Sequence, residues 1–189
     1  MALSRQAIVD AGLGILDAYG LGDLSMRRVA DVLGVQAGAL YYHVPNKQSL
    51  LAALSEEVLS TVLDPLDDTD PSTWLTIWAT SLRQSLLARR DAAELVASAL
   101  ALGLVGPDPT EAGRALLERE GFHEPEATMA TLLHFVLGHV VEEQTRAQMH
   151  ALGVVAEFDA AASGARFEWG VRLIVAGAGW LMHDEAQRR

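Results

Sequence analysis

Residues 24–50 contain two short stretches with helical periodicity, separated by Gly34, and a further helix start follows at Asn46. Ser25 is the expected N-cap of the first of these helices, and Gly34 supplies the positive φ that a tight turn between two helices needs. The apolar side chains expected to face inward are Val29, Ala30, Leu33, Val35 and Leu40. This layout predicts a helix-turn-helix over about residues 25–44, a motif whose second helix enters the major groove of DNA.

The other long segments also have the period of a helix, and no run alternates in the way that a strand does. Gly20 follows residues 4–19 as a C-terminal glycine. The predicted helices cover residues 4–19, 26–33, 36–43, 46–63, 71–90, 92–104, 110–121, 125–152, a short one within 156–163, and 165–185. We therefore expect an all-α fold.

The acidic, proline-bounded stretch 64–72 is the best candidate for a domain boundary. It predicts a three-helix DNA-binding domain over residues 1–63 that contains the helix-turn-helix. Residues 64–189 then form a C-terminal helical domain for ligand binding and dimerisation.

The formal net charge of −11 argues against indiscriminate binding to nucleic acid, because a basic surface drives that mode. Residues 1–63 carry four basic and six acidic side chains. Few phosphates would be neutralised by each chain, so two chains acting together would help.

No cysteine is present, which excludes disulfides and thiolate metal sites. The first residues lack the apolar core of a signal peptide. Long uncharged stretches such as 127–141 are too short to span a bilayer. We expect a cytoplasmic protein without a membrane partner.

Residues 24–51 resemble the DNA-binding domain of the TetR family of bacterial repressors. From Leu40 onward the chain has the pattern Leu-Tyr-x-His-Val-x-Asn-Lys-x-x-Leu-Leu, which is especially similar to the tetracycline repressors of that family. The likeness covers about residues 4–63. It implies a homodimeric repressor that binds double-stranded operator DNA and is released by a small-molecule effector.

Four positions are expected to read bases. Arg27 falls where the family often has a base-reading arginine, and its side chain suits guanine. An amide at Gln36 can pair with adenine, while Ala37 and Ala39 offer small apolar contacts that suit a thymine methyl group.

Other positions are expected to hold the DNA backbone. The resemblance implies sugar and phosphate contacts for Tyr41, Tyr42 and His43. Lys47 would hold a phosphate at a helix N-terminus. Arg28 is also among the residues expected to contact DNA. The alternatives are that one tyrosine packs between helices, that Arg28 is a solvated surface charge, and that His43 only ends a helix.

Two long helices near the C-terminus have more apolar surface than one chain can cover. Apolar residues surround nearly the whole circumference of residues 125–152, and such a helix must be covered on two sides. The last helix has two stripes: Phe167, Val171, Ile174 and Leu181 on one, and Trp169, Leu173, Ala176 and Trp180 on the other. We expect residues 125–152 and 165–185 to pair with their copies in a four-helix bundle. The alternative is a monomer with a larger core.

An effector cavity is expected between the helices of the C-terminal domain. The residues predicted to line it are Trp74, Trp78, Leu82, Ser85, Ser98, Leu102, Met129, Phe135 and Glu142. Each of them could instead be an ordinary core residue.

Residues 134–144 resemble a segment of the tetracycline repressors, which bind tetracycline with magnesium and have a glutamate near the metal at the place of Glu142. The histidine of those proteins before Thr-x-Pro-Thr has no counterpart near Leu104. A second histidine of those proteins lies near the end of their fourth helix, and residues 59–63 of this chain contain no histidine. We therefore expect a more hydrophobic effector, and neither a metal nor a cofactor.

Two other classes of function stay open. A helical di-iron enzyme needs two Glu-x-x-His pairs, but the chain has one such spacing, Glu120 to His123, across a helix end. His139 and Glu142 could share a helix face without a visible third ligand. No phosphate loop or nucleophile motif occurs, so we expect no enzyme. A helical adaptor that does not bind DNA is the other alternative.

Overall fold

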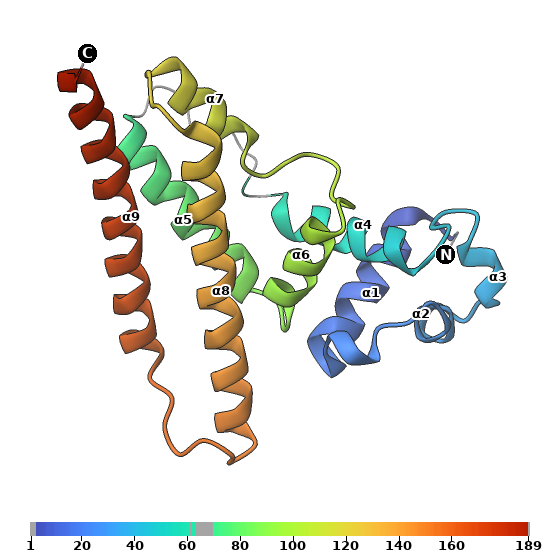
Figure 1. Ribbon diagram of the computed structural model, residues 1–189. Coiled ribbons are helices and arrows are strands. Elements are labelled where there is room, and N and C mark those ends of the chain that lie inside the picture. The colour runs from blue at the N-terminus through green and yellow to red at the C-terminus, as the bar shows by residue number, and fades with distance from the viewer. Residues whose placement is uncertain (1–2, 61, 63–69, 189) are drawn as a thin grey trace. The chain divides into compact units, whose positions relative to one another are not determined.

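The computed structural model describes residues 3–60, 62 and 70–188, with side chains up to residue 179. Every regular element within these ranges is a helix, which confirms the expected all-α fold (Figure 1). The described residues form two compact units. The first contains residues from 1–60 and 85–107, and the second contains residues from 61–84 and 108–189.

These units interleave along the chain, whereas a single boundary is predicted between residues 63 and 64. Helix α5, Pro71–Leu87, belongs to the second unit up to residue 84 and to the first unit from residue 85. The predicted boundary stays a prediction, and residues 63–69 of the expected connection lie outside the described residues.

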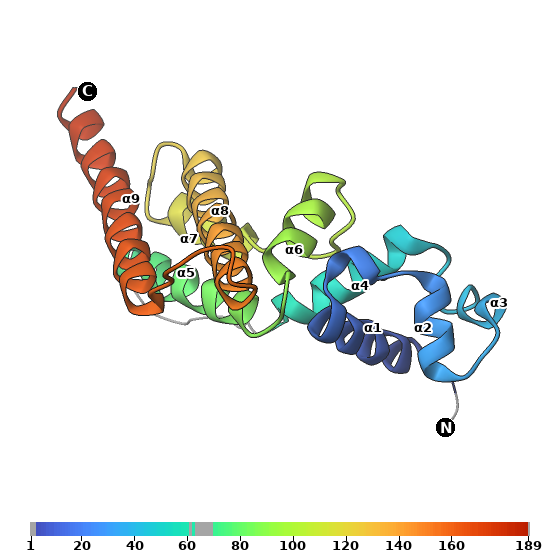
Figure 2. The ribbon, with the colours of Figure 1, turned by 90° about the horizontal axis from the view of Figure 1, so that it is seen from below.

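Short helices around a small apolar core make up the first unit. Its helices are α1 (Arg5–Tyr19), η1 (Leu21–Asp23), α2 (Met26–Leu33), α3 (Ala37–Leu40), α4 (Lys47–Leu59), the end of α5, and α6 (Ala92–Ala101). The side chains of Ile8, Leu16, Leu40, Leu50 and Leu54 are fully buried in it. Helices α2 and α3 follow one another through a short turn (Figure 2).

Local signals fix the ends of these helices as expected. The Ser25 side chain accepts a hydrogen bond from the backbone N–H of Arg28 at 3.2 Å, and the Asn46 side chain accepts one from Ser49 at 2.8 Å. Gly34 ends α2 in the left-handed conformation with φ 66°. The helix-turn-helix geometry therefore follows from residues that lie three or four positions apart.

Helix α3 is shorter than the predicted 36–43, which is a correction to the sequence-based expectation. Residues 41–43 form a turn in which the N–H groups of His43 and Val44 both bind the carbonyl of Leu40, at 2.9 and 2.8 Å. Pro45 disfavours helical backbone at Val44, and this restriction ends the helix early. The ends of α5, α6 and α7 also come two to three residues before the predicted ones.

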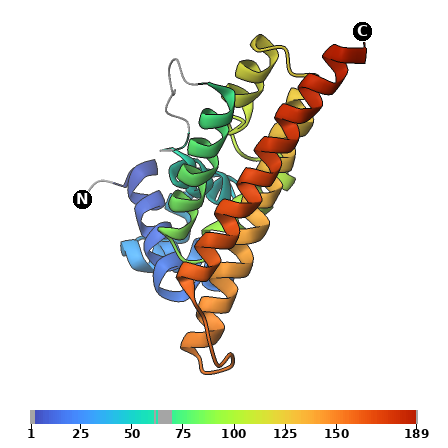
Figure 3. The same cartoon turned by 90° about the vertical axis from the view of Figure 1, so that its left-hand side faces the viewer.

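Three further helices complete the second unit: α7 (Glu111–Arg119), α8 (Pro125–Ala151) and α9 (Ala160–Arg188). Helices α8 and α9 lie side by side over much of their length (Figures 1 and 3). The predicted break between a short helix at 156–163 and a long one from 165 is wrong. Gly164 continues the helix, and the Asp159 side chain caps its start by accepting a hydrogen bond from Ala162 at 3.0 Å.

The core of the second unit is tightly packed where α5, α7 and α8 meet. The rings of Trp74 and Trp78 stack with centroids 6.3 Å apart. A Cβ atom at Gly113 would lie 2.5 Å from Sδ of Met129 and 2.6 Å from the ring of Trp74, so only glycine allows this approach. Within the described residues, no helix is long and apolar enough to cross a membrane.

Candidate nucleic-acid interface and buried ionic cluster

The helix-turn-helix presents most of its predicted DNA-contacting side chains to solvent. Tyr42 is 92% exposed and Tyr41 is 50% exposed, so neither is buried between helices. The other members of the set are Arg27, Gln36, His43 and Lys47, which are exposed, and Arg28, Ala37 and Ala39, which are half-buried. The structure thus leaves room for a partner at this surface.

The two adjacent arginines of α2 have different environments. Arg27 is exposed and makes no ion pair with a carboxylate of the described residues. Arg28 forms an ion pair with Asp23, and its guanidinium lies 3.9 Å from the ring centroid of Tyr19. Arg27 is therefore available to an anion, whereas Arg28 already has partners within its own unit.

Lys47 lies at the first position of α4, next to the capping residue Asn46. The unpaired N–H groups at a helix N-terminus carry a partial positive charge, which adds to that of the ammonium group. This end of α4 can therefore bind a phosphate.

The predicted effector residues are divided between the two units. In the second unit, Trp74, Trp78, Leu82 and Met129 are buried and Phe135 is half-buried. In the first unit, the Ser85 hydroxyl donates to the carbonyl of Val58, Ser98 is exposed, and Leu102 is 63% exposed. The role of these residues in ligand binding stays a prediction.

Glu142 lies on an exposed part of α8 and is 3.7 Å from Arg146. The next residue, Glu143, is the buried carboxylate, with 4% of its surface exposed. Glu143 follows the buried Val136 and Val140 by seven and three residues and so continues their stripe of the helix, whereas Glu142 points about 100° away from it. The motif singled out Glu142 in the sequence, and Glu143 was missed.

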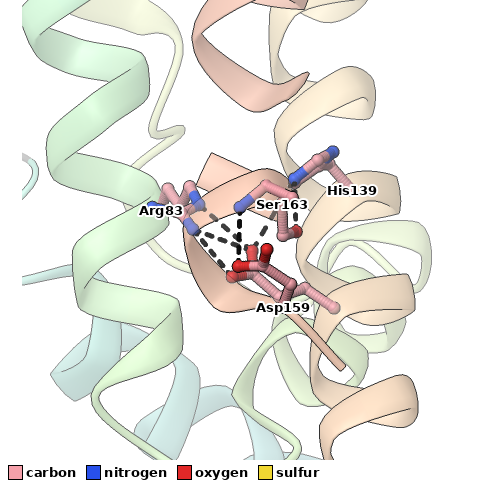
Figure 4. A network of polar contacts seen from close by, with 6 residues as sticks. Arg83, His139, Asp159 and Ser163 are labelled. Atoms are coloured by element: carbon pink, nitrogen blue, oxygen red, sulfur yellow. Dashed lines mark hydrogen bonds and ion pairs between the residues drawn. The ribbon is translucent and has the colours of Figure 1, made fainter. Parts of the chain in front are cut away.

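The buried carboxylate of Glu143 binds Arg83 of α5, which is labelled in Figure 4, through several hydrogen bonds. Nη2 of Arg83 donates to Oε1 at 2.7 Å and to Oε2 at 3.0 Å, while Nε donates to Oε2 at 3.2 Å. This arrangement satisfies both carboxylate oxygens, which a buried ion pair requires to offset its loss of hydration. The pair joins α5 to α8 inside the second unit.

His139 extends this cluster toward the start of α9. Its Nε2 atom lies 3.7 Å from Oε2 of Glu143 and 3.3 Å from Oγ of Ser163. Burial lowers the pKa of His139 below its ordinary value, and Arg83 lowers it further, against the opposing attraction of Glu143. The imidazole is therefore held in its neutral form more strongly than in water.

Serine, histidine and glutamate lie together here without forming a catalytic triad. In a triad the two imidazole nitrogens face opposite partners, but here Nε2 faces both Ser163 and Glu143. Ser163 is also fully buried, so no substrate reaches its hydroxyl. The geometry of this cluster is therefore that of a packing contact between helices and not that of a catalytic triad.

Phe167 packs against three members of this region. Its ring centroid lies 5.7 Å from that of Phe135, 5.4 Å from that of His139, and 5.1 Å from Cζ of Arg83. Beside it on α9, Gly170 leaves the space that the Phe135 ring fills.

The two apolar stripes of α9 have opposite environments within a single chain. Phe167 and Val171 are buried, and Ile174 is half-buried. Trp169 and Leu173 are 59% and 57% exposed, and Ala176 is exposed too. The side chains of Trp180 and Leu181 lie outside the described residues. An apolar face this exposed favours burial by another chain.

Among the residues that the structure describes, no group of three or more histidine, aspartate or glutamate side chains could hold a metal ion. His123, at the end of the single Glu-x-x-His spacing, lies 3.6 Å from Glu124 rather than in an acidic cluster.

Two family models match the chain. The model described as bacterial regulatory proteins of the tetR family matches residues 8–54, and the one described as the tetracyclin repressor-like C-terminal domain matches residues 64–167. The chain is 38% identical to the class C tetracycline repressor of Escherichia coli over 149 residues, which cover 75% of this chain and 67% of the relative. It is 34% identical to the class A repressor from transposon 1721 of Escherichia coli, covering 93% and 90% of the two chains.

Solved structures share this fold over nearly the whole chain. BioQ of Mycobacterium smegmatis superposes with a TM-score of 0.88 at 32% identity, covering 95% of this chain and 99% of that one. A structure of BioQ with its double-stranded DNA operator has a TM-score of 0.80 at 31% identity, with 94% and 98% covered. A variant of TetR from Acinetobacter baumannii, in complex with minocycline, has a TM-score of 0.81 at 28% identity, with 96% and 99% covered.

Proposed function

Because the chain belongs to the TetR family of bacterial regulatory proteins, we propose that it is a homodimeric repressor that leaves its operator when a small-molecule effector binds. It is a DNA-binding transcriptional regulator of the ligand-responsive type. The observation that carries the proposal is the exposed helix-turn-helix, in which Arg27 and Lys47 lie at the surface. The proposal places the protein in the cytoplasm and gives it no catalytic activity.

The DNA-reading roles are assigned from exposure and chemistry. Arg27 reads a guanine and Gln36 an adenine, while Ala37 and Ala39 contact thymine methyl groups. The backbone contacts come from Tyr41, Tyr42, His43 and Lys47. Arg28 contributes less, because Asp23 and Tyr19 already hold its guanidinium.

The dimer buries the exposed stripe of α9 together with α8 in a four-helix bundle with the partner's copies. Support comes from the exposure of Trp169 and Leu173, which a monomer leaves in water. Pairing also doubles the number of phosphate contacts, which an acidic chain needs. The two recognition helices would then meet half-sites about one helical turn apart, roughly 34–36 Å.

The DNA-binding proposal is tested by titrating the full-length protein onto the palindromic DNA nearest its own gene at several salt concentrations. We expect Lys47→Gln to weaken binding to all sequences and to lower the salt dependence by about one unit of slope, whereas Arg27→Ala relaxes discrimination at one base pair. Arg119→Gln, an exposed charge of α7, is the matched control and should change neither. If the wild-type protein shows no preference for its palindrome over other DNA, the result contradicts the repressor proposal and favours the helical adaptor.

The dimer is tested by measuring the mass of the protein in solution. Leu173→Glu should shift the equilibrium toward monomer, since it places a charge in an apolar interface. Leu152→Glu changes another exposed leucine, in the connection between α8 and α9, and should leave the mass unchanged. A wild-type monomer at micromolar concentration contradicts the proposal.

The effector is expected to be less polar than tetracycline with magnesium, because the two histidines of the tetracycline repressors are missing here. A panel of compounds tested by thermal shift checks this, since a ligand of the folded state raises its apparent stability. A magnesium-dependent shift by tetracycline would contradict it.

A further inference from the structure

The exposed stripe of α9 has two opposite charges beside its large apolar side chains. Trp169 and Leu173 form the middle of the stripe and are 59% and 57% exposed. Glu168 and Arg172 each precede one of them in the chain, and both are exposed. Residues four positions apart lie on the same side of a helix, so the two charges follow one edge of the apolar stripe.

Glu168 and Arg172 are at positions i and i+4, a spacing at which a glutamate and an arginine often pair on one helix. The same spacing gives an ion pair on α8, where Glu142 lies 3.7 Å from Arg146. Among the described residues no ion pair joins Glu168 to Arg172, and the guanidinium of Arg172 lies instead 5.3 Å from the ring centroid of Trp169. Both charges are therefore available to groups of another molecule.

The position of Arg172 over the ring of Trp169 places its charge at the border of the apolar stripe. An arginine at such a place covers apolar surface with its stem and keeps its N–H donors at the rim. A chain that covers Trp169 also removes part of Arg172 from water, and charges that are partly buried are screened less by salt than exposed ones. The charge of Arg172 can therefore favour one partner over another.

The arrangement of the two charges suits a second copy of this chain. In a dimer with two-fold symmetry, a contact of residue i with residue j of the partner is repeated as a contact of j with i. One glutamate and one arginine on a single stripe satisfy this rule when the axis passes between them. The formal net charge of −11 makes two copies repel each other at long range, so their association gains from a local attraction.

We propose that Glu168 of each protomer binds the partner's Arg172, and that these two equivalent ion pairs select a second copy of this chain. The inference rests on the homodimer of the proposed function and adds to it the residues that decide the choice of partner. The apolar contacts of Trp169 and Leu173 supply buried area but discriminate little between apolar surfaces. Opposite charges at the rim reject a helix that presents like charges there.

The first test reverses one charge at a time in the full-length protein and measures its mass by sedimentation equilibrium. Glu168→Arg and Arg172→Glu each place two pairs of like charges in the homodimer. We expect each variant to dimerise about tenfold more weakly than the wild type. The double variant has opposite charges at both places again and should dimerise as the wild type does. High salt should reduce the defect of the single variants, because it screens like charges.

A mixture of the two single variants gives the decisive measurement. One chain then has two arginines at these positions and the other has two glutamates, so only the heterodimer brings opposite charges together. Native mass spectrometry, with one chain enlarged by a tag, distinguishes the heterodimer from the two homodimers. The heterodimer should exceed its share in a random mixture. Random mixing, or single variants that dimerise as tightly as the wild type, overturns the ion pairs.

Arg114→Glu and Glu118→Arg are the matched controls, because these two residues form an exposed ion pair at the same spacing within α7. Neither control should change the mass, and the two should mix at random. Arg166 is another exposed arginine of α9. If Glu168→Arg forms a selective heterodimer with Arg166→Glu and not with Arg172→Glu, the assignment of Arg172 as the partner of Glu168 is overturned.

Failure of this inference can be told apart from failure of the proposed function. A wild-type protein that is monomeric at micromolar concentration rejects the homodimer and the ion pairs together. A wild-type dimer whose charge variants mix at random rejects the ion pairs alone. Operator binding on the same preparations supports the inference if the heterodimer of the two variants binds the palindrome as tightly as the wild type and each single variant binds it more weakly.

Discussion

Half-buried Arg83 of α5 and buried Glu143 of α8, sixty residues apart in the chain, form an ion pair with three hydrogen bonds. Removal of one partner leaves an uncompensated charge in the core. We expect Glu143→Leu or Arg83→Met alone to lower the free energy of unfolding by about 3–5 kcal/mol. The double variant should recover much of this loss, because an apolar pair needs no hydration.

Denaturant unfolding at one fixed protein concentration measures these changes. Arg114→Met is the control, since Arg114 and Glu118 form an exposed pair whose loss should change the free energy by no more than about 1 kcal/mol. A double variant that is as unstable as the sum of its single variants contradicts the expectation.

His139 should make the second unit sensitive to acid. Its pKa is lowered in the folded protein, so the unfolded chain binds its proton at a higher pH. The contribution of neutral His139 to the stability of the folded protein is complete above about pH 6.5, the pKa of histidine in the unfolded chain. This contribution is lost as the pH falls through the lowered pKa of the folded protein. Melting temperatures between neutral and acidic pH should fall less in His139→Gln. His134→Gln, a substitution on an exposed part of α8, should follow the wild type.

Asp91 should be replaceable by asparagine but not by alanine. It has φ 54°, a left-handed conformation, and its Oδ2 accepts a hydrogen bond from the N–H of Leu21 at 2.9 Å. Asparagine tolerates this backbone and keeps an acceptor, whereas alanine does neither. We expect Asp91→Ala to lower the free energy of unfolding by about 1–3 kcal/mol. A loss as large in Asp91→Asn would show that the charge matters more than the geometry.

Gly113 should be sensitive to the addition of a single methyl group. A Cβ atom there meets Met129 and Trp74 within 2.6 Å, which forces α7 away from α8. Gly113→Ala should cost about 1–3 kcal/mol by overpacking. Gly14→Ala places the same methyl group in open space on α1 and should instead stabilise by up to about 1 kcal/mol. Thermal unfolding of the two variants should therefore shift in opposite directions.

The first unit was largely predictable because its signals are local. Ser25, Gly34 and Asn46 act on backbone groups within four residues of themselves, and the structure has each of them in its expected role. The errors there concern helix ends, such as that of α3, where Pro45 shortens the helix. The expected break near Gly164 failed because a single glycine in a long helix costs less than the packing of α9 gains.

The sequence by itself determined the helices, their caps, the helix-turn-helix and the likeness to the TetR family, because these depend on residues close together in the chain. Tertiary structure alone decided that Arg83 of α5 is the partner of Glu143 and that His139 and Ser163 lie beside this pair. The period of a helix shows which of its faces is buried, but only packing against other helices decides which polar side chains meet there.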